Sequence, residues 1–179
     1  MSTTSIRHED KPFLDKVRAV APKFAVHFKH HWLKYGITLA VLTVLQNTVT
    51  IGFNVSPSLP GHVYLVLKTG EVHKGELVGF YWHGNYPYAK GSSFVKYAAG
   101  TEGDRVSRDG RNYSINGKQM GRAKELSLTG EPLEMGPTGV IPANKIYVMA
   151  PHKDSLDSRY ALTGWIDKKQ VIGPAYEIF

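Results

Sequence analysis

The feature that most constrains this chain is a long stretch without charged residues near its N-terminus. No Asp, Glu, Lys or Arg occurs in Tyr35–Leu67, and its first part, Tyr35–Phe53, is apolar apart from threonines, Gln46 and Asn47. About 20 residues at ~1.5 Å rise each cross a bilayer core of roughly 30 Å. Threonine hydroxyls are tolerated there because they bond back to the helix. We therefore predict one N-terminal transmembrane helix, an anchor over residues 35–53.

The charges on either side of this stretch predict its orientation. The next basic residue after it is Lys68, whereas seven basic residues precede it: Arg7, Lys11, Lys16, Arg18, Lys23, Lys29 and Lys34. Positive flanks stay cytoplasmic. Residues 1–34 are thus predicted to be a basic cytoplasmic flank, with residues 54–179 in the periplasm of a bacterium, beyond its inner membrane. The alternative interpretation is a buried helix of a soluble domain. A cleaved signal peptide does not fit, because it would need a shorter segment before the apolar stretch and an A-x-A cleavage site after it.

Composition excludes several classes of protein and site. The net charge of +7 is spread along the 179 residues rather than clustered, so we expect no nucleic-acid partner. The absence of cysteine excludes disulfides, thiolate metal sites and cysteine nucleophiles. His27 and His31 are four residues apart on a possible helix, but no third ligand is near them. We therefore expect no metal and no other cofactor.

Beyond residue 53 the pattern favours strands. Short alternating or apolar runs are separated by glycines and prolines, which is typical of an antiparallel β domain. A small hairpin is expected at Arg108–Lys118, within a hairpin region near residues 108–138, because turn residues lie at both of its ends. The predicted strands are His62–Leu67, Glu76–Trp82, Ser93–Ala98, Lys145–Met149 and Gln170–Phe179.

Two serines follow the apolar stretch in a conformationally restricted segment. Ser56 and Ser58 lie in S-P-S-L-P-G, where two prolines and a glycine restrict the backbone. Taken alone, the segment fits a rigid linker that leaves the bilayer. It also fits a nucleophile held at the membrane surface, where the substrate could itself be a membrane segment.

A lysine with apolar neighbours is the second feature. In a strand, Lys96 shares a face with Phe94 and Ala98. Burial disfavours the charged form of a lysine. Action as a general base needs a pKa lowered from about 10.4 to roughly 7–8, at a cost of roughly 3–5 kcal/mol. Taken alone, this lysine also fits an edge residue that reaches toward water.

The third feature is a polar segment near the C-terminus, Asp154–Tyr160, which reads D-S-L-D-S-R-Y. Asp157 and Arg159 lie on one side of an extended chain and could form an ion pair. Ser155 lies two residues before Asp157. A surface turn is the alternative interpretation.

Together the three features match a known pattern. In order the chain contains S-x-S-x-P-x-x-x-Y, then F-V-K-Y-A-A-G-T-E-G-D-R-V, then D-S-L-D-S-R-Y. This combination resembles the type I signal peptidase family of Ser–Lys proteases, over roughly Asn54–Phe179 and the preceding anchor. Asn54–Tyr64 looks most like the conjugative-transfer branch, whose members process pilin precursors of plasmid transfer systems. The resemblance implies a mainly β, antiparallel, signal-peptidase-like domain.

The resemblance implies roles for individual residues. Ser58 matches the nucleophile and Lys96 the general base of a Ser–Lys dyad. Ser56 matches the position whose hydroxyl, with the backbone N–H of Ser58, forms the oxyanion hole.

Further residues match positions that support the dyad. Ser155 matches the serine that orients the lysine, and Asp157 and Arg159 match a structural ion pair behind it. The chain departs from the housekeeping enzymes at Leu59, where they usually have Met, and at Tyr97, where they often have Arg. These departures favour a dedicated peptidase over a general one.

The resemblance implies a membrane-anchored serine endopeptidase that processes exported precursors. Its substrate would be a membrane-embedded precursor, the pilin precursor of a conjugative system, with a linear or a circular product. The lipid bilayer and a conjugative secretion apparatus are the other partners it implies. A general type I signal peptidase, a non-catalytic scaffold of a secretion apparatus, and a Ser–His–Asp hydrolase are the alternatives. The histidines open to the last of these are His62, His73, His83 and His152.

Overall fold

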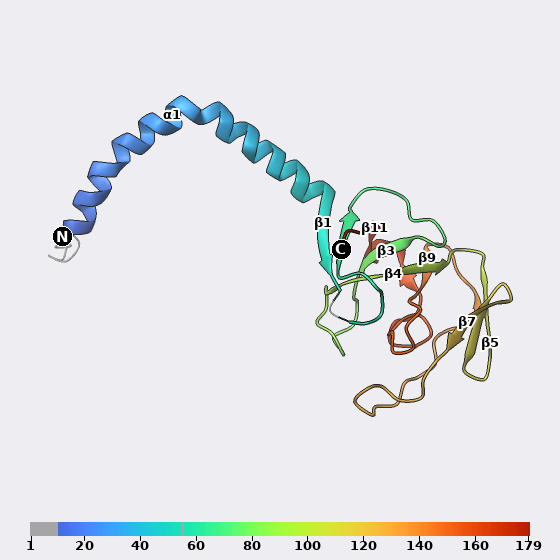
Figure 1. Cartoon of the computed structure of the whole chain (residues 1–179). Helices are drawn as coiled ribbons and strands as arrows, with labels where there is room; N and C mark the ends of the chain where they lie inside the picture. The colour runs from blue at the N-terminus through green and yellow to red at the C-terminus, as the bar shows by residue number, and fades with distance from the viewer. Residues whose placement is uncertain (1–10, 55) are drawn as a thin grey trace, which may run out of the picture. The chain divides into compact units, whose positions relative to one another are not determined.

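The computed structural model describes residues 11–54 and 56–179, without the side chains of residues 11–17. The predicted basic flank, residues 1–34, therefore lies partly outside the described residues. Contacts divide the chain into two compact units, Met1–Gln46 and Asn47–Phe179 (Figure 1). We call the second the β unit, and each unit is described by itself.

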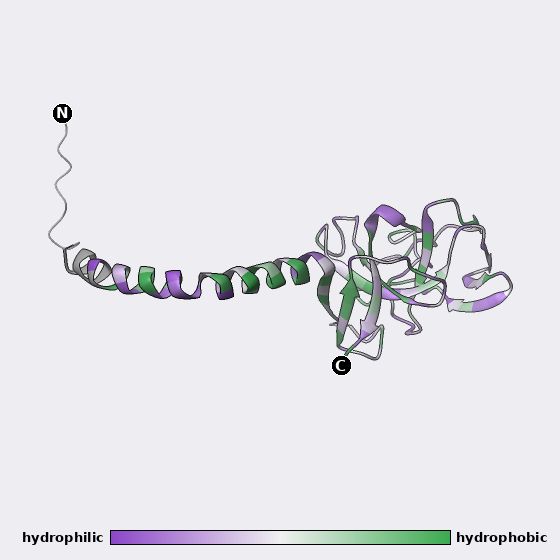
Figure 2. Cartoon of the chain, turned by 90° about the horizontal axis from the view of Figure 1, so that it is seen from above, coloured by the Kyte–Doolittle hydropathy of each residue, from purple (hydrophilic) through white to green (hydrophobic). Residues whose placement is uncertain are grey.

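The N-terminal unit is built on one helix. α1 spans Lys11–Thr48 and runs through Pro22. Its hydrophobic turns are concentrated in its second half (Figure 2), where Ile37 and Leu39 expose 57% and 67% of their surface. Within residues 11–54 and 56–179, no helix is both long enough and apolar enough to cross a membrane.

The prediction of a single helix over residues 35–53 is wrong at its C-terminal end. The helix ends at Thr48, and the last five residues form the strand β1, Val49–Phe53. All five pair with β2 in an antiparallel register, from Val49 opposite Leu67 to Phe53 opposite Val63. Three successive β-branched residues favour a strand. The apolar composition of these residues suggested a membrane span, but their backbone pairs with β2 instead.

The β unit confirms the predicted mainly antiparallel fold. Its larger sheet has the strand order β1-β2-β11-β3-β4-β9-β10, in which all neighbouring pairs are antiparallel. Five of its strands, all except β1 and β10, coincide with predicted runs to within two residues at every end. The bounds are β2 (Val63–Leu67), β3 (Leu77–Tyr81), β4 (Ser93–Gly100), β9 (Lys145–Met149), β10 (Ile166–Asp167) and β11 (Val171–Glu177).

A second, four-stranded sheet has the order β7-β6-β5-β8. β5 and β6 form a hairpin in which Asp109 lies opposite Asn112. The next turn, between β6 and β7, is built on Asn116 and Gly117, with φ angles of 49° and 82°, and Asn-Gly is the pair that tight hairpin turns prefer. The bounds are β5 (Arg105–Asp109), β6 (Asn112–Ile115), β7 (Lys118–Arg122) and β8 (Gly139–Val140).

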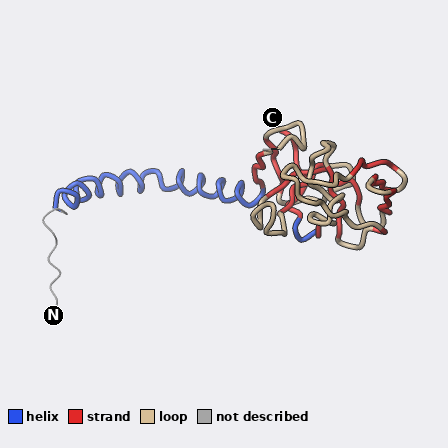
Figure 3. Tube along the Cα trace, turned by 90° about the horizontal axis from the view of Figure 1, so that it is seen from below, coloured by secondary structure: helices blue, strands red, loops and turns tan. Residues whose placement is uncertain are grey.

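The core fixes the position of β4, the strand that carries Lys96. Ala98 packs beside Val78 and Val148 in one buried cluster between neighbouring strands. At the end of β4, Gly100 lies against Ile141 and Tyr147, and a Cβ there would come within 2.8 Å of the Ile141 side chain. Long loops connect the strands (Figure 3), and they carry the remaining residues of the site.

Candidate active site

The loop that carries Ser58 is organised by Asn54, which follows β1. The Asn54 Nδ2 group donates to the carbonyl oxygens of Leu59 and Gly61, both at 3.0 Å. Its Oδ1 atom accepts from the backbone N–H of Ser56 at 3.2 Å and from the Ser56 hydroxyl at 3.1 Å. One side chain thus closes the loop from both ends. We did not single out Asn54 from the sequence, although an Asn two residues before a serine is a known turn-forming pattern.

Ser58 is buried in this loop, with 6% of its surface exposed. Its Oγ atom lies 2.9 Å from the Ser56 Oγ atom. Because the single hydroxyl hydrogen of Ser56 is donated to Asn54, the Ser56 oxygen accepts from Ser58. The next residue, Leu59, is anchored in a buried cluster with Tyr64 and Ala150. The nucleophile candidate therefore has a fixed backbone and a hydroxyl that is already hydrogen-bonded.

Lys96 is a buried lysine whose ammonium group forms no ion pair with a carboxylate of the described residues. It lies on β4 opposite Val78, is 4% exposed, and donates from Nζ to the Ser155 Oγ atom at 3.0 Å. Burial lowers its pKa from 10.5 to about 8; the charge of Asp157 raises the pKa and that of Arg159 lowers it further. A pKa near 8 leaves an appreciable fraction of neutral amine close to neutral pH, as general-base action requires.

Asp157 and Arg159 form a fully buried ion pair behind Ser155. Arg159 donates from Nη2 and Nε to the two Asp157 carboxylate oxygens, at 2.8 and 2.9 Å. The Arg159 Nη1 atom also donates to the carbonyl oxygen of Arg122, the last residue of β7, at 3.2 Å. Asp157 accepts from the Ala150 backbone N–H at 3.3 Å. The pair therefore ties the Ser155 segment to both sheets.

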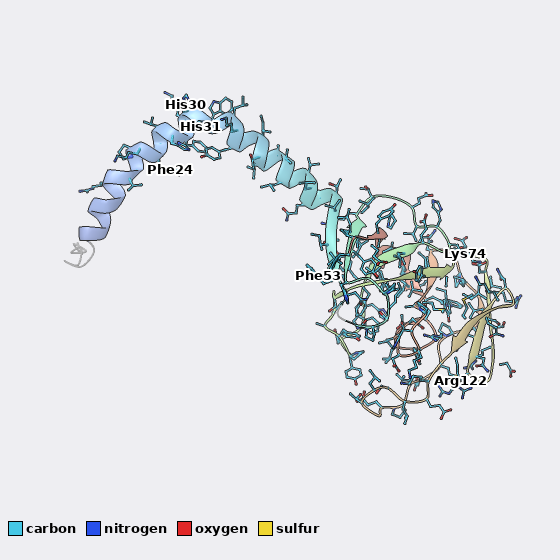
Figure 4. All side chains as sticks on the ribbon, viewed as in Figure 1. Phe24, His30, His31, Phe53, Lys74 and Arg122 are labelled. Carbon is cyan, nitrogen blue, oxygen red and sulfur yellow. The ribbon has the colours of Figure 1, made fainter. Side chains whose placement is uncertain are left out.

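Ser56, Ser58 and Lys96 line one cavity of about 230 Å³. Its walls come from the end of β1 and the start of β4, and exposed Phe53 belongs to its lining (labelled in Figure 4). Among the hydrogen bonds of the described residues, none joins Lys96 to Ser58. The two side chains line the same cavity, but Ser58 is hydrogen-bonded to Ser56 and Lys96 to Ser155.

The four histidines considered for a Ser–His–Asp site lie outside the cavity that holds Ser58. They are His62, His73, His83 and His152. His152 instead contacts its neighbour Asp154, whose backbone N–H lies 3.2 Å from its Nδ1 atom. In the described part of the chain, no group of three or more His, Asp or Glu could hold a metal ion.

A cavity that combines a buried serine with a buried lysine of lowered pKa offers the groups that a serine peptidase needs, a nucleophile and a base. Comparison with known proteins agrees: the model of the family "Signal peptidase, peptidase S26" matches residues 27–179. The chain therefore belongs to the signal peptidase family of serine proteases. It is similar to signal peptidase I of Bacillus licheniformis, with 32% identity over 168 residues that cover 83% of this chain and 87% of the relative.

Proposed function

We propose that this protein is a serine endopeptidase in which Ser58 is the nucleophile and Lys96 the general base. The observation that carries the proposal is a buried lysine, with a pKa lowered to about 8, in the same cavity as a buried serine on a loop that Asn54 hydrogen-bonds. Family membership supports the reaction class. Because no histidine lines the cavity, Lys96 is the base that its lining offers.

The reaction is an acyl transfer in two steps. Neutral Lys96 takes the hydroxyl proton of Ser58 as the Ser58 oxygen bonds to the scissile carbonyl carbon. The C–N bond then breaks, and the Lys96 ammonium returns the proton to the leaving nitrogen. In the second step Lys96 takes a proton from water, whose oxygen attacks the acyl carbon, and Ser58 recovers its hydrogen. The hydrogen bond from Ser58 to Ser56 must open for the first transfer.

Ser56 is suited to stabilise the oxyanion. Its hydroxyl lies 2.9 Å from the nucleophile oxygen and donates to Asn54 in the free protein. A rotation of this hydroxyl, together with the Ser58 backbone N–H, would supply two donors to the oxyanion. Removal of one such donor typically costs about 3 kcal/mol in transition-state stabilisation.

Ser155, Asp157 and Arg159 hold the lysine in position. The Ser155 hydroxyl fixes Nζ, and the buried ion pair fixes the Ser155 segment. The ion pair also adjusts the pKa of Lys96, because Asp157 favours the ammonium and Arg159 disfavours it.

The substrate we propose is the pilin precursor of a conjugative transfer system. The support is the segment N-V-S-P-S-L-P-G-H-V-Y around Ser58, with Leu59 and Tyr97 in place of the residues usual in housekeeping enzymes. A general signal peptidase that cleaves many exported precursors is the second candidate, which similarity to signal peptidase I of Bacillus licheniformis favours. If the amino terminus of the substrate replaces water in the second step, the product is a circular peptide.

We propose that the enzyme acts at the periplasmic face of the bacterial inner membrane, where its precursors emerge. Apolar side chains exposed along the second half of α1, such as Val41 and Leu42, support contact between this helix and lipid. Contact with a conjugative secretion apparatus belongs to the same proposal.

The test is co-expression of a pilin precursor with wild-type, Lys96→Ala and Ser58→Ala enzymes, followed by mass spectrometry of the product. We expect processing by the wild type alone, with each variant folded and at wild-type abundance. A product one water lighter than the trimmed linear peptide would identify cyclisation. Rescue of a cell depleted of its own signal peptidase would instead favour the general enzyme. Unchanged processing by Lys96→Ala would remove Lys96 from the mechanism.

A further inference from the structure

A second and larger cavity, of about 800 Å³, has Ser155 in its lining. We call it the leaving-side cavity. Its lining residues come from three loops and lie within residues 86–88, 124–134 and 154–162. Its volume lies toward the upper end of the range for ligand pockets, about 300–1,000 Å³. None of the catalytic roles proposed above uses this space.

The hydrogen bond between Lys96 and Ser155 connects one lining residue of each cavity. Ser155 lines the leaving-side cavity and accepts from Lys96 Nζ at 3.0 Å, while Lys96 lines the smaller cavity with Ser58. Tyr88 belongs to the lining of both. A peptide attacked by Ser58 must place its leaving nitrogen where the Lys96 ammonium can protonate it. The chain that follows this nitrogen is therefore directed past Lys96 and Ser155, toward the larger cavity.

The lining is apolar and carries an excess of negative charge. Large apolar side chains are exposed on it, among them Leu126, Leu128, Leu162 and Tyr86. The lining residues with a formal charge at neutral pH are Lys124, Glu131, Glu134 and Asp154. Three carboxylates against one ammonium leave two negative charges, in a chain whose net charge is +7.

Glu134 is the carboxylate most available to a ligand. Asp154 forms an ion pair with Lys124, and Glu131 accepts a hydrogen bond from the Tyr86 hydroxyl. The exposed side chain of Glu134 has no partner among the described residues. A cationic group in the cavity would gain an opposite charge there without displacing an existing pair.

We propose that the leaving-side cavity binds the residues of the precursor that follow the scissile bond, and that it selects segments with apolar and positively charged side chains. The inference rests on the proposed function, because it needs Ser58 and Lys96 to define where the bond is cut. By microscopic reversibility, an amine that attacks the acyl-enzyme enters from the same side as the leaving amine. The cavity is therefore also where the amino-terminal segment of a substrate would bind during cyclisation.

The test uses three synthetic substrates with the same acyl side, which ends in alanine, and the full chain in detergent micelles. One continues into a segment with two lysines, one into the same segment with two glutamates, and one ends in a small chromogenic amine. The enzymes are the wild type, Glu134→Lys and the matched control Glu102→Lys, which changes an exposed glutamate outside the lining of either cavity. The measurement is kcat/KM with kcat and KM separated.

We expect the wild type and Glu102→Lys to prefer the lysine substrate. Glu134→Lys should reduce this preference about fivefold, mainly through KM, because it turns an exposed charge attraction into a repulsion. Cleavage of the chromogenic substrate should be equal in all three enzymes, which also shows that each is folded. The preference should shrink with added salt.

Two results would separate the possible failures. If Glu134→Lys keeps the wild-type preference while all substrates are cleaved, the leaving-side cavity does not bind this segment and the inference is overturned. If the wild type cleaves none of the three, or if Lys96→Ala cleaves them as well as the wild type, the proposed function itself fails.

Discussion

Replacement of Lys96 by methionine should stabilise the protein while abolishing its activity. Lys96 is 4% exposed, and burial lowers its pKa from 10.5 to about 8. A difference of this size corresponds to roughly 3 kcal/mol of unfavourable interaction of the charged form. Methionine has a similar length and no charge, so Lys96→Met removes this cost. It also leaves the Ser155 hydroxyl without its donor, which offsets the gain by about 1 kcal/mol.

The sign of the pH dependence follows from proton binding. Between pH of about 8 and 10.5 the unfolded chain keeps the Lys96 proton and the folded protein has lost it. The unfolded state therefore binds more protons, so the contribution of Lys96 to the free energy of unfolding rises with pH across this window. Below pH 8 both states are protonated and the contribution is constant. The advantage of Lys96→Met should be about 2 kcal/mol at pH 7 and should disappear by about pH 10.5.

The assay is urea unfolding of the full chain in detergent, followed by tryptophan fluorescence, since Trp82 and Trp165 lie in the β unit. Wild type and Lys96→Met are compared at several pH values. Equal m-values show that both unfold in the same transition. The reasoning is refuted if Lys96→Met is less stable than the wild type at pH 7, or if the difference between them does not change with pH.

Four further outcomes are expected. The wild-type kcat/KM should rise with pH and level off above about pH 8, because neutral Lys96 is the active form; a bell centred below pH 7 would contradict this. Ser155→Ala should lower kcat by about a hundredfold at unchanged KM in a peptide-cleavage assay, because Nζ loses its hydrogen bond. Asn54→Ala should lower kcat by at least about tenfold through a loosened Ser58 loop, and Asn54→Asp should not rescue it, since the carboxylate cannot donate to Leu59 and Gly61. Asp157→Asn should lower the free energy of unfolding by about 3–5 kcal/mol in urea titrations, because Arg159 keeps a buried charge without its counter-charge.

Much of the β fold could be predicted because its strands alternate and its turns contain glycine, proline or Asn-Gly. β2, β3, β4, β9 and β11 all lie within or close to predicted runs. β1 could not be predicted in this way. It continues the apolar stretch of α1, and composition alone does not distinguish a buried or membrane helix from an edge strand. Residues 49–53 form a strand because they pair with β2, which follows later in the chain.

Sequence motifs predict the residues of the candidate site but not their hydrogen bonds. Ser58, Lys96 and Ser155 lie in short motifs, and the structure joins the last two directly. Asn54 donates to the carbonyl oxygens of Leu59 and Gly61, five and seven residues later in the chain. No short sequence motif predicts hydrogen bonds of this kind, because they depend on how the loop folds back. The leaving-side cavity is formed by three segments far apart in sequence, none of which carries a motif of its own.

The central claim is that Ser58 attacks and that Lys96 activates it. The most direct measurement is intact-protein and peptide mass spectrometry after acid quenching of the enzyme mixed with a precursor peptide. The account predicts an acyl group on the peptide that contains Ser58 in the wild type, and none in Ser58→Ala or in folded Lys96→Ala. An acyl group on another residue, or wild-type acylation in Lys96→Ala, would contradict it.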